Sequence, residues 1–235
     1  MSVPIKPIAL AAALVLAAGC DRAAPAANAA TADGEASFVA ADSAPAGEAA
    51  DGAADPVIAP QLHAAMRDLW HGHIVHSRDY AMAVHAGDEA RADAAADAVV
   101  ANARQIADAV AGFYGDAGGD QMMTLLAGHW GAIKALTDAR SADDEAAASG
   151  AMADLTANAG AIAAFLATAN PNLPEDAVRG MLLAHGAHHA RQIKQVMAGD
   201  TAGEAATWTA MQAHMDGIAD ALASAIARQF PDKAG

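Results

Sequence analysis

The sequence Leu-Leu-Ala-Gly-His, at residues 125–129, occurs in two further versions in this 235-residue chain. Its histidine, His129, lies 56 residues after His73 and 56 residues before His185. Apolar residues precede the three histidines at the same two distances, four residues before (Leu69, Leu125, Met181) and three residues before (Trp70, Leu126, Leu182). A fixed period of this length indicates an internal repeat.

A second set of positions has the same period. Its polar members are Asn102, Asn158 and His214. Each is followed at the same distances by apolar residues, namely Ile106, Ile162 and Ile218, then Val110, Leu166 and Leu222. Because the two sets stay in register, we interpret the chain as three units of 56 residues.

Helical breaks and caps divide each unit into two helices. Apolar residues recur at spacings of three and four, and no strand pattern is visible. Glycine, proline and capping residues predict helices at about 60–86, 88–114, 120–140, 141–169, 174–199 and 201–230, the third, fourth and sixth beginning at Asp120, Ser141 and Thr201. The sequence therefore predicts an all-α, up-and-down antiparallel bundle of about six helices, built from three helical hairpins within residues 58–231.

The repeated polar positions lie at similar distances from the turn of each hairpin. At a rise of about 1.5 Å per residue, they fall near one height in the bundle. We expect them to form a polar layer across the middle of the bundle, made of His73, Asn102, His129, Asn158, His185 and His214.

The four histidines of this polar layer are candidate metal ligands, because neutral imidazole binds transition metals and bundle cores hold such sites. The predicted ligands are His73, His129, His185 and His214, with Asn102 and Asn158 orienting the rings. Additional candidates stand nearby at helical spacing, namely His76, His188, His189, Met181, Met211 and Met215. Imidazole with thioether favours copper, especially Cu(I), and the alternative ion is zinc.

Two other interpretations remain open. In the first, the polar layer is purely structural and fixes the helix register, and the protein is a non-enzymatic interaction module. In the second, the protein is a haem- or metal-dependent enzyme. Little in the sequence favours it, since the chain has no Cys-x-x-Cys-His haem attachment, no Glu-x-x-His pair, no phosphate-binding loop and no nucleophile elbow.

The first 57 residues are predicted to lie outside the bundle. Residues 1–19 resemble a bacterial lipoprotein signal peptide that ends before Cys20, the single cysteine and the expected site of lipidation. An ordinary secretory signal cut near the same place is the alternative. Residues 20–57 are rich in Ala, Asp, Gly and Pro, which predicts a disordered tether. We therefore expect a membrane-anchored lipoprotein that faces the periplasm or the exterior.

The charge of the chain argues against nucleic acid as a binding partner. The chain has 28 acidic and 13 basic residues, a formal net charge of -15. An acidic protein lacks the basic face that nucleic-acid phosphates require. Nucleic acid is therefore not an expected partner. The expected contact is the membrane, through the lipid at Cys20, and the sequence leaves a protein partner open and identifies none.

Several motifs resemble a family of small bacterial helical proteins. The matching segments are Leu69-Trp70 with His73, Asn102, Phe113-Tyr114-Gly115, Leu125-Leu126 with His129, Asn158-Ala159, Asn170-Pro171-Asn172, Met181 with His185, and Gln229-Phe230-Pro231. Some members carry the automatically assigned names acetylglutamate kinase and glycosyltransferase, although this chain has no signature of either enzyme. The resemblance, over residues 65–231, implies a helical fold and singles out the same His and Asn positions. Where the family has tryptophan, this chain has His76.

Overall fold

The structure is a computed structural model that describes residues 59–234. The predicted signal peptide, Cys20 and the tether lie outside the described residues. Residues 59–234 contain no strand, which confirms the all-helical bundle. Seven helices are present rather than six: α1 (Pro60–Ala86), α2 (Glu89–Tyr114), α3 (Asp116–Ser141), α4 (Glu145–Ala169), α5 (Glu175–Met197), α6 (Thr201–Gln229) and the short α7 (Pro231–Ala234).

Short connections with suitable capping residues join the helices. α1 ends at Gly87, whose φ of 67° lies in the left-handed region that favours glycine. Asp88, Asp144 and Asp200 cap α2, α4 and α6, because each side chain accepts a hydrogen bond from the backbone N–H three residues later. These three aspartates are 56 residues apart in the sequence.

The expected caps of α4 and α6 are each displaced. Ser141 is the last residue of α3, and Thr201 is the first residue of α6, immediately after the capping Asp200. In both connections an aspartate carboxylate accepts the hydrogen bond that the sequence pattern assigned to a hydroxyl group. Glu204, in the first turn of α6, points inward and binds Arg78.

The start of α3 also differs from the prediction. The helix begins at Asp116 rather than at Asp120, so the glycines at 118 and 119 are helical. A Cβ atom on Gly119 would lie 2.9 Å from the backbone oxygen of Ala107. These glycines therefore allow α2 and α3 to approach closely. The glycine-rich composition of this segment predicted a break before the helix, but the segment is part of α3.

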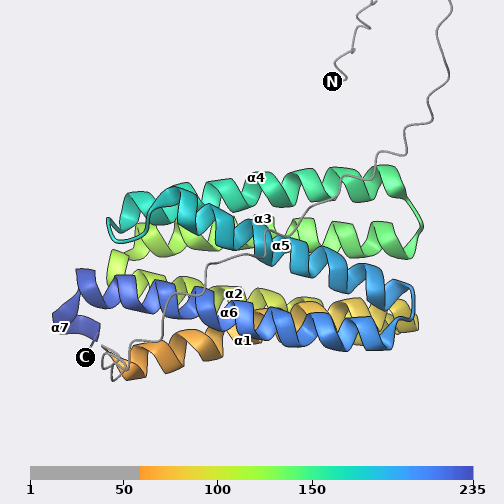
Figure 1. The fold of residues 1–235 in the computed structure, drawn as a ribbon, viewed down its shortest axis with the longest axis horizontal. Coiled ribbons are helices and arrows are strands. Elements are labelled where there is room, and N and C mark those ends of the chain that lie inside the picture. Colours follow the sequence, from red (N-terminus) through yellow and green to blue (C-terminus); the bar gives the residue numbers. More distant parts are fainter. Residues whose placement is uncertain (1–58, 235) are drawn as a thin grey trace, which may run out of the picture. The chain divides into compact units, whose positions relative to one another are not determined.

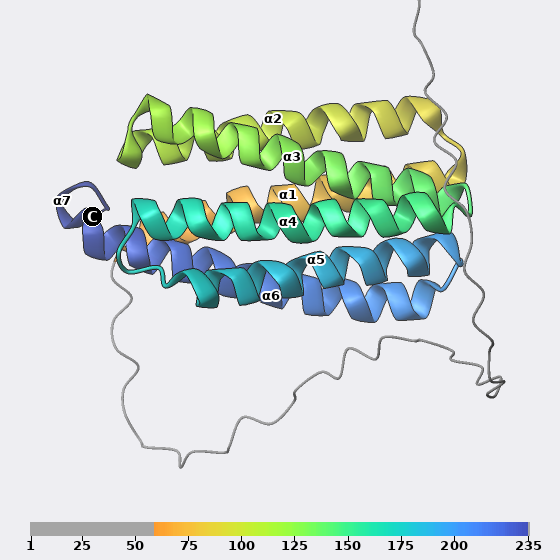
Figure 2. The same cartoon turned by 90° about the horizontal axis from the view of Figure 1, so that it is seen from above.

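Consecutive helices run side by side (Figures 1 and 2). Each of α1 to α5 packs against the next helix, and α6 packs against α1, so the six long helices form a closed ring. α1, α3 and α5 also contact one another, so they make up the inside of the bundle. Side chains that point inward from these three helices therefore meet near the axis.

Two hydrophobic clusters fill the bundle, one toward each end of the inner helices. One includes Trp70, Leu126 and Leu182, which precede the repeated histidines. The other includes Tyr80 and Ile193, which follow them. The histidines thus occupy the boundary between two apolar regions, where buried polar groups need partners.

α4 has a distinct composition. By length and composition alone it is apolar enough to cross a membrane, and it is the one such helix among the described residues. Alanine supplies much of this apolar character, and α4 packs between α3 and α5. Its position is that of a bundle helix.

Candidate metal centre

Four imidazoles converge where the three inner helices meet. α1 supplies His73, α3 supplies His129, and α5 supplies both His185 and His189. All four residues are between 1 and 4 % exposed. One ligand nitrogen of each lies within 4.8 Å of those of the other three. We refer to these residues as the four-histidine cluster.

His185 and His189 form the closest pair in this cluster. They are four residues apart on α5, so their side chains share one face of the helix. Their Nε2 atoms are 3.1 Å apart, so in the absence of a metal one ring donates a hydrogen bond to the other. Ligand nitrogens at the corners of a tetrahedral zinc site lie about 3.3 Å apart when each metal–nitrogen bond is about 2.0–2.1 Å. This pair therefore already has the spacing of two metal ligands.

The rings of His73 and His129 complete the cluster. Their ring centroids are 5.4 Å apart, and each lies 5.6 Å from the centroid of His185. The ligand nitrogens of the cluster lie within 4.8 Å of one another. Each distance between two of these nitrogens therefore exceeds the tetrahedral value of about 3.3 Å by at most about 1.5 Å. Side-chain rotations of small amplitude would therefore bring all four nitrogens to one ion.

Several buried ring nitrogens of the cluster have no hydrogen-bond partner within residues 59–234. They are His73 Nε2, His129 Nε2 and His185 Nδ1. A buried polar atom without a partner costs about 1–3 kcal/mol, and such atoms are uncommon in native proteins. A metal ion would satisfy the lone pairs of His73 Nε2 and His129 Nε2, whereas His185 would bind the ion through Nε2, the nitrogen that faces His189.

Burial keeps the cluster uncharged. Desolvation, together with the smaller effects of the neighbouring His129 and His76, lowers the pKa of His73 from 6.5 to about 3. Desolvation lowers the pKa of His129 to about 4, although its hydrogen bond with Asn158 acts in the opposite direction. Desolvation also lowers the pKa values of His185 and His189 well below 6.5. Neutral imidazole is the form that binds metal ions.

Polar residues of the outer helices hold the layer together. Asn102 Nδ2 donates to the Leu69 carbonyl at 2.9 Å, and Asn158 Nδ2 donates to the Leu125 carbonyl at 2.9 Å. His214 Nε2 makes the corresponding bond to the Met181 carbonyl at 2.9 Å, and all three bonds join residues 33 positions apart.

Asn158 also contacts the cluster directly. Its Oδ1 lies 3.2 Å from His129 Nδ1, so the amide oxygen accepts a hydrogen bond from the ring. This contact fixes the tautomer of His129 and leaves Nε2 with its lone pair free. Asn158 thus occupies the position of a residue that orients a metal ligand.

Glycine makes room for two of these asparagines. A Cβ atom on Gly72 would lie 2.7 Å from Asn102 Nδ2, and one on Gly128 would lie 3.1 Å from Asn158 Nδ2. Both glycines directly precede a cluster histidine. The Gly-His pair is therefore part of the geometry that brings the outer helices against the inner ones.

The remaining predicted site residues lie around the cluster. His214 is half-buried on α6, and its ring stacks on that of His185 with 6.4 Å between centroids, so the structure places His189 rather than His214 among the four. His76 and His188 are half-buried and lie outside the four. Met211 is fully buried in the apolar core.

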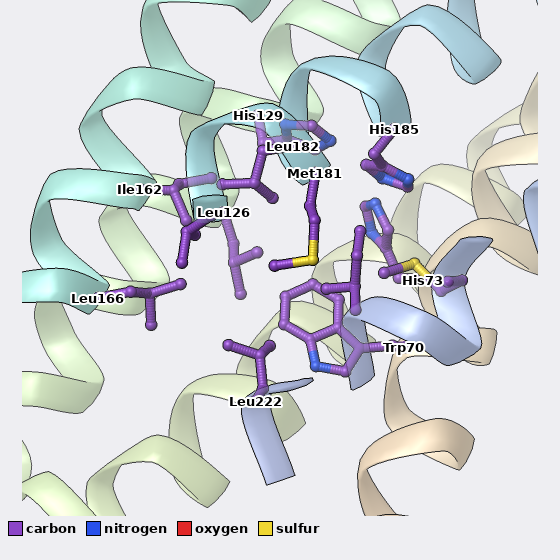
Figure 3. Close-up of a pocket in the computed structure, with 13 residues that line it drawn as sticks. Trp70, His73, Leu126, His129, Ile162, Leu166, Met181, Leu182, His185 and Leu222 are labelled. Carbon is purple, nitrogen blue, oxygen red and sulfur yellow. The ribbon is translucent and has the colours of Figure 1, made fainter. Parts of the chain in front are cut away.

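Met181 and Met215 line a small cavity of about 20 Å³ beside the cluster. His73, His129 and His185 form part of its wall, and the other lining residues are apolar. Figure 3 shows these three rings along one side, with the Met181 side chain between them and Trp70. Two thioethers thus stand close to the imidazoles, although the ligand group itself contains histidine alone.

An ion pair between the half-buried Arg78 and the buried Glu204 lies on the other side of the layer. Arg78 binds Glu204 through two hydrogen bonds of 2.6 and 2.8 Å, and Gln192 Nε2 donates to the same carboxylate at 2.9 Å. The sequence pattern did not single out this network, because its members come from three helices and share no motif. The three residues tie α1, α5 and α6 together one or two turns beyond the cluster.

Comparison of the chain with protein-family models, with curated proteins and with solved structures finds no match. The resemblance to the bacterial helical family therefore stays a prediction.

Proposed function

We propose that this protein binds one transition-metal ion, copper or zinc, through His73, His129, His185 and His189. One observation carries the proposal: four uncharged, buried imidazoles converge from three helices, and ring nitrogens among them have no other partner. Four histidine nitrogens satisfy the usual four-coordinate requirement of such ions. His129 would be oriented by Asn158.

The charge of the site favours Cu(I) over Zn(II). The four-histidine cluster brings no negative charge, and the nearby carboxylate of Glu204 is already paired with Arg78. A divalent ion would therefore keep two buried positive charges, whereas Cu(I) would keep one. Burial of uncompensated charge is costly, and the thioethers of Met181 and Met215 are soft groups that suit Cu(I).

The proposal includes the internal repeat, in which three similar units of 56 residues each supply part of the site. Each 56-residue unit would contribute one hairpin, with one cluster histidine on its first helix and a residue on its second helix that hydrogen-bonds the first. The aspartate caps and the three bonds between residues 33 positions apart support this reading. The fourth ligand, His189, would belong to the third unit alone.

We also propose that the domain is tethered outside the cytoplasm. The support comes from the sequence, in which a lipoprotein-like signal leads to Cys20 and a tether rich in small and polar residues. Membership of the bacterial helical family is proposed on the same footing, from the motifs within residues 65–231. A tethered protein of this kind would hold or transfer metal ions at the cell envelope.

A non-enzymatic interaction module is the second candidate. The observation that favours it is that Asn102, Asn158 and His214 each bond a carbonyl of the neighbouring helix without any help from a metal. In that case the polar layer only fixes the register of the helices. The two candidates differ in whether the cluster retains an ion.

Metal content separates them. The purified protein is refilled separately with Zn(II), Cu(I), Cu(II) and Fe(II), desalted and measured by mass spectrometry. We expect near-stoichiometric retention of one ion, lost in His129→Gln and His189→Gln. His76→Gln is the matched control, since His76 is half-buried one turn from His73 and lies outside the cluster. Retention of no ion by the unaltered protein would refute the metal proposal.

A further inference from the structure

The four-histidine cluster cannot meet an ion directly from solvent. Its members are at most 4 % exposed, and apolar side chains cover the cavity beside them. A hydrated ion must therefore first reach ligands at the surface and then exchange them for the buried ones.

His188 and His214 are placed to serve as those first ligands. Both are half-buried, one on α5 and one on α6, and their ring centroids are 5.2 Å apart. His214 also stacks on His185, with 6.4 Å between centroids and an angle of 17° between the ring planes. Imidazoles thus continue without interruption from the half-exposed surface to the cluster.

The hydrogen bond of His214 determines which of its nitrogens is available. A carbonyl oxygen can only accept, so Nε2 donates its hydrogen to the Met181 carbonyl. In a neutral ring Nδ1 then keeps its lone pair. His214 is therefore fixed in position and still has one free donor atom for a metal ion.

We infer that His188 and His214 form a second, shallow metal site, through which a transition-metal ion reaches the four-histidine cluster. We call these two residues the loading pair. The inference rests on the proposed function of the cluster. Two imidazoles bind an ion less tightly than four, so an ion gains ligands as it moves inward. Each step exchanges nitrogen ligands, and the charge of the ion does not change.

The same chain supplies a well-matched variant for His214. Asn102 and Asn158 occupy the equivalent positions on α2 and α4, and each donates to the equivalent carbonyl. His214→Asn should therefore keep the bond to Met181 while it removes the imidazole. His188→Gln removes the second imidazole and keeps a polar side chain.

The test measures how fast the metal-free protein takes up Co(II), used as a coloured substitute for Zn(II), by stopped-flow absorbance. If the protein retains Cu(I) but not Co(II), the same test uses Cu(I) supplied as a coloured chelator complex, whose absorbance falls as the protein takes up the ion. The final Co(II) content is measured separately by mass spectrometry. We expect the double variant of the loading pair to reach the same final content as the unaltered protein at a rate that is at least severalfold lower, because the ion then finds no imidazole at the surface from which to exchange inward. The control His76→Gln should load at the unaltered rate.

The possible outcomes are distinguishable. An unchanged rate in the double variant, or a slower rate in His76→Gln alone, would overturn the loading pair and leave the cluster intact. A lower final content in the double variant would make these residues ligands of the buried centre and would also overturn it. If the unaltered protein retains no Co(II), Zn(II) or Cu(I), the proposed function fails, and the loading pair fails with it.

A second arm tests the shallow site by itself. In His73→Gln/His129→Gln/His189→Gln only His185 of the buried centre remains, and the loading pair is intact. This variant should still bind Co(II) weakly in equilibrium dialysis, and the addition of His214→Asn should abolish that binding. Equal weak binding with and without His214→Asn would contradict the inference.

Discussion

The metal-free protein should lose stability sharply when the pH falls from 7 to 5. Its four cluster histidines are uncharged and buried, and desolvation lowers all their pKa values. In the unfolded chain the same side chains take up protons near pH 6.5. Between these pKa values the unfolded state binds more protons than the folded state, so acid favours unfolding.

The size of the effect follows from the pKa values of His73 and His129. His73 has a pKa of about 3 and His129 a pKa of about 4, so both remain uncharged in the folded protein at pH 5. The contribution of each histidine to the free energy of unfolding is fully present above pH 6.5. Between pH 7 and pH 5 this contribution falls by at most about 2 kcal/mol for each histidine. The two together cost about 4 kcal/mol, and His185 and His189 act in the same direction. The total free energy of unfolding of a folded domain is about 5–15 kcal/mol, so this loss is a large part of it.

Urea unfolding of the chelator-treated protein at pH 7, 6 and 5 measures this loss. His73→Gln removes one titrating group, so its free energy of unfolding should depend less steeply on pH. The control is His85→Gln, because His85 is exposed near the end of α1. The carboxylate of Glu204 does not interfere, since its hydrogen bond with Arg78 lowers its pKa below 4.5.

Two results would refute this reasoning. One is a free energy of unfolding that changes by less than about 1 kcal/mol between pH 7 and pH 5, because each fully buried histidine alone accounts for about twice that amount. The other is an identical pH dependence in His73→Gln and the unaltered protein. Either result would mean that water reaches the cluster and that its rings titrate normally.

Three further predictions concern the same region. Saturating metal should raise the free energy of unfolding by about 4 kcal/mol at a thousandfold excess over Kd, measured by thermal unfolding, and a variant without one cluster imidazole should show no such rise. Gly72→Ala should lower the free energy of unfolding, measured in urea, by about 1–3 kcal/mol, because the new Cβ would lie 2.7 Å from the Asn102 amide. The control is Gly131→Ala, which has open space around it and should be neutral or stabilising. Arg78→Met should cost about 3 kcal/mol by the same measurement, since it leaves the buried Glu204 carboxylate without its cation; an unchanged midpoint would show that water compensates.

Local sequence signals located the six long helices. Gly87 and Asp88 mark the first connection, and the structure ends α1 and caps α2 at these residues. The start of α3 was wrong because two glycines were read as a break, whereas they serve a close contact with α2. Composition does not reveal whether a glycine interrupts a helix or lets a neighbouring helix approach.

The sequence predicted the residues of the polar layer more easily than the fourth member of the four-histidine cluster. The period of 56 residues pointed to His214 as the fourth imidazole, but the polar position on the second helix of each hairpin bonds a carbonyl of the first helix. His189 takes the fourth place, and its spacing of four from His185 was the available signal. The network of Arg78, Gln192 and Glu204 had no such signal, because tertiary packing alone brings it together.

The closed ring of helices has a consequence for cooperativity. In an open array of helical pairs the end units fray, because each has only one neighbour. Here α6 packs against α1, and Ala59 and Ala234 belong to one apolar cluster at the ends of the described chain. No pair of helices is terminal, so local unfolding has no preferred starting point. A circular permutant joined at these two alanines and opened in the connection between α3 and α4 should therefore preserve every helix contact and all four ligands.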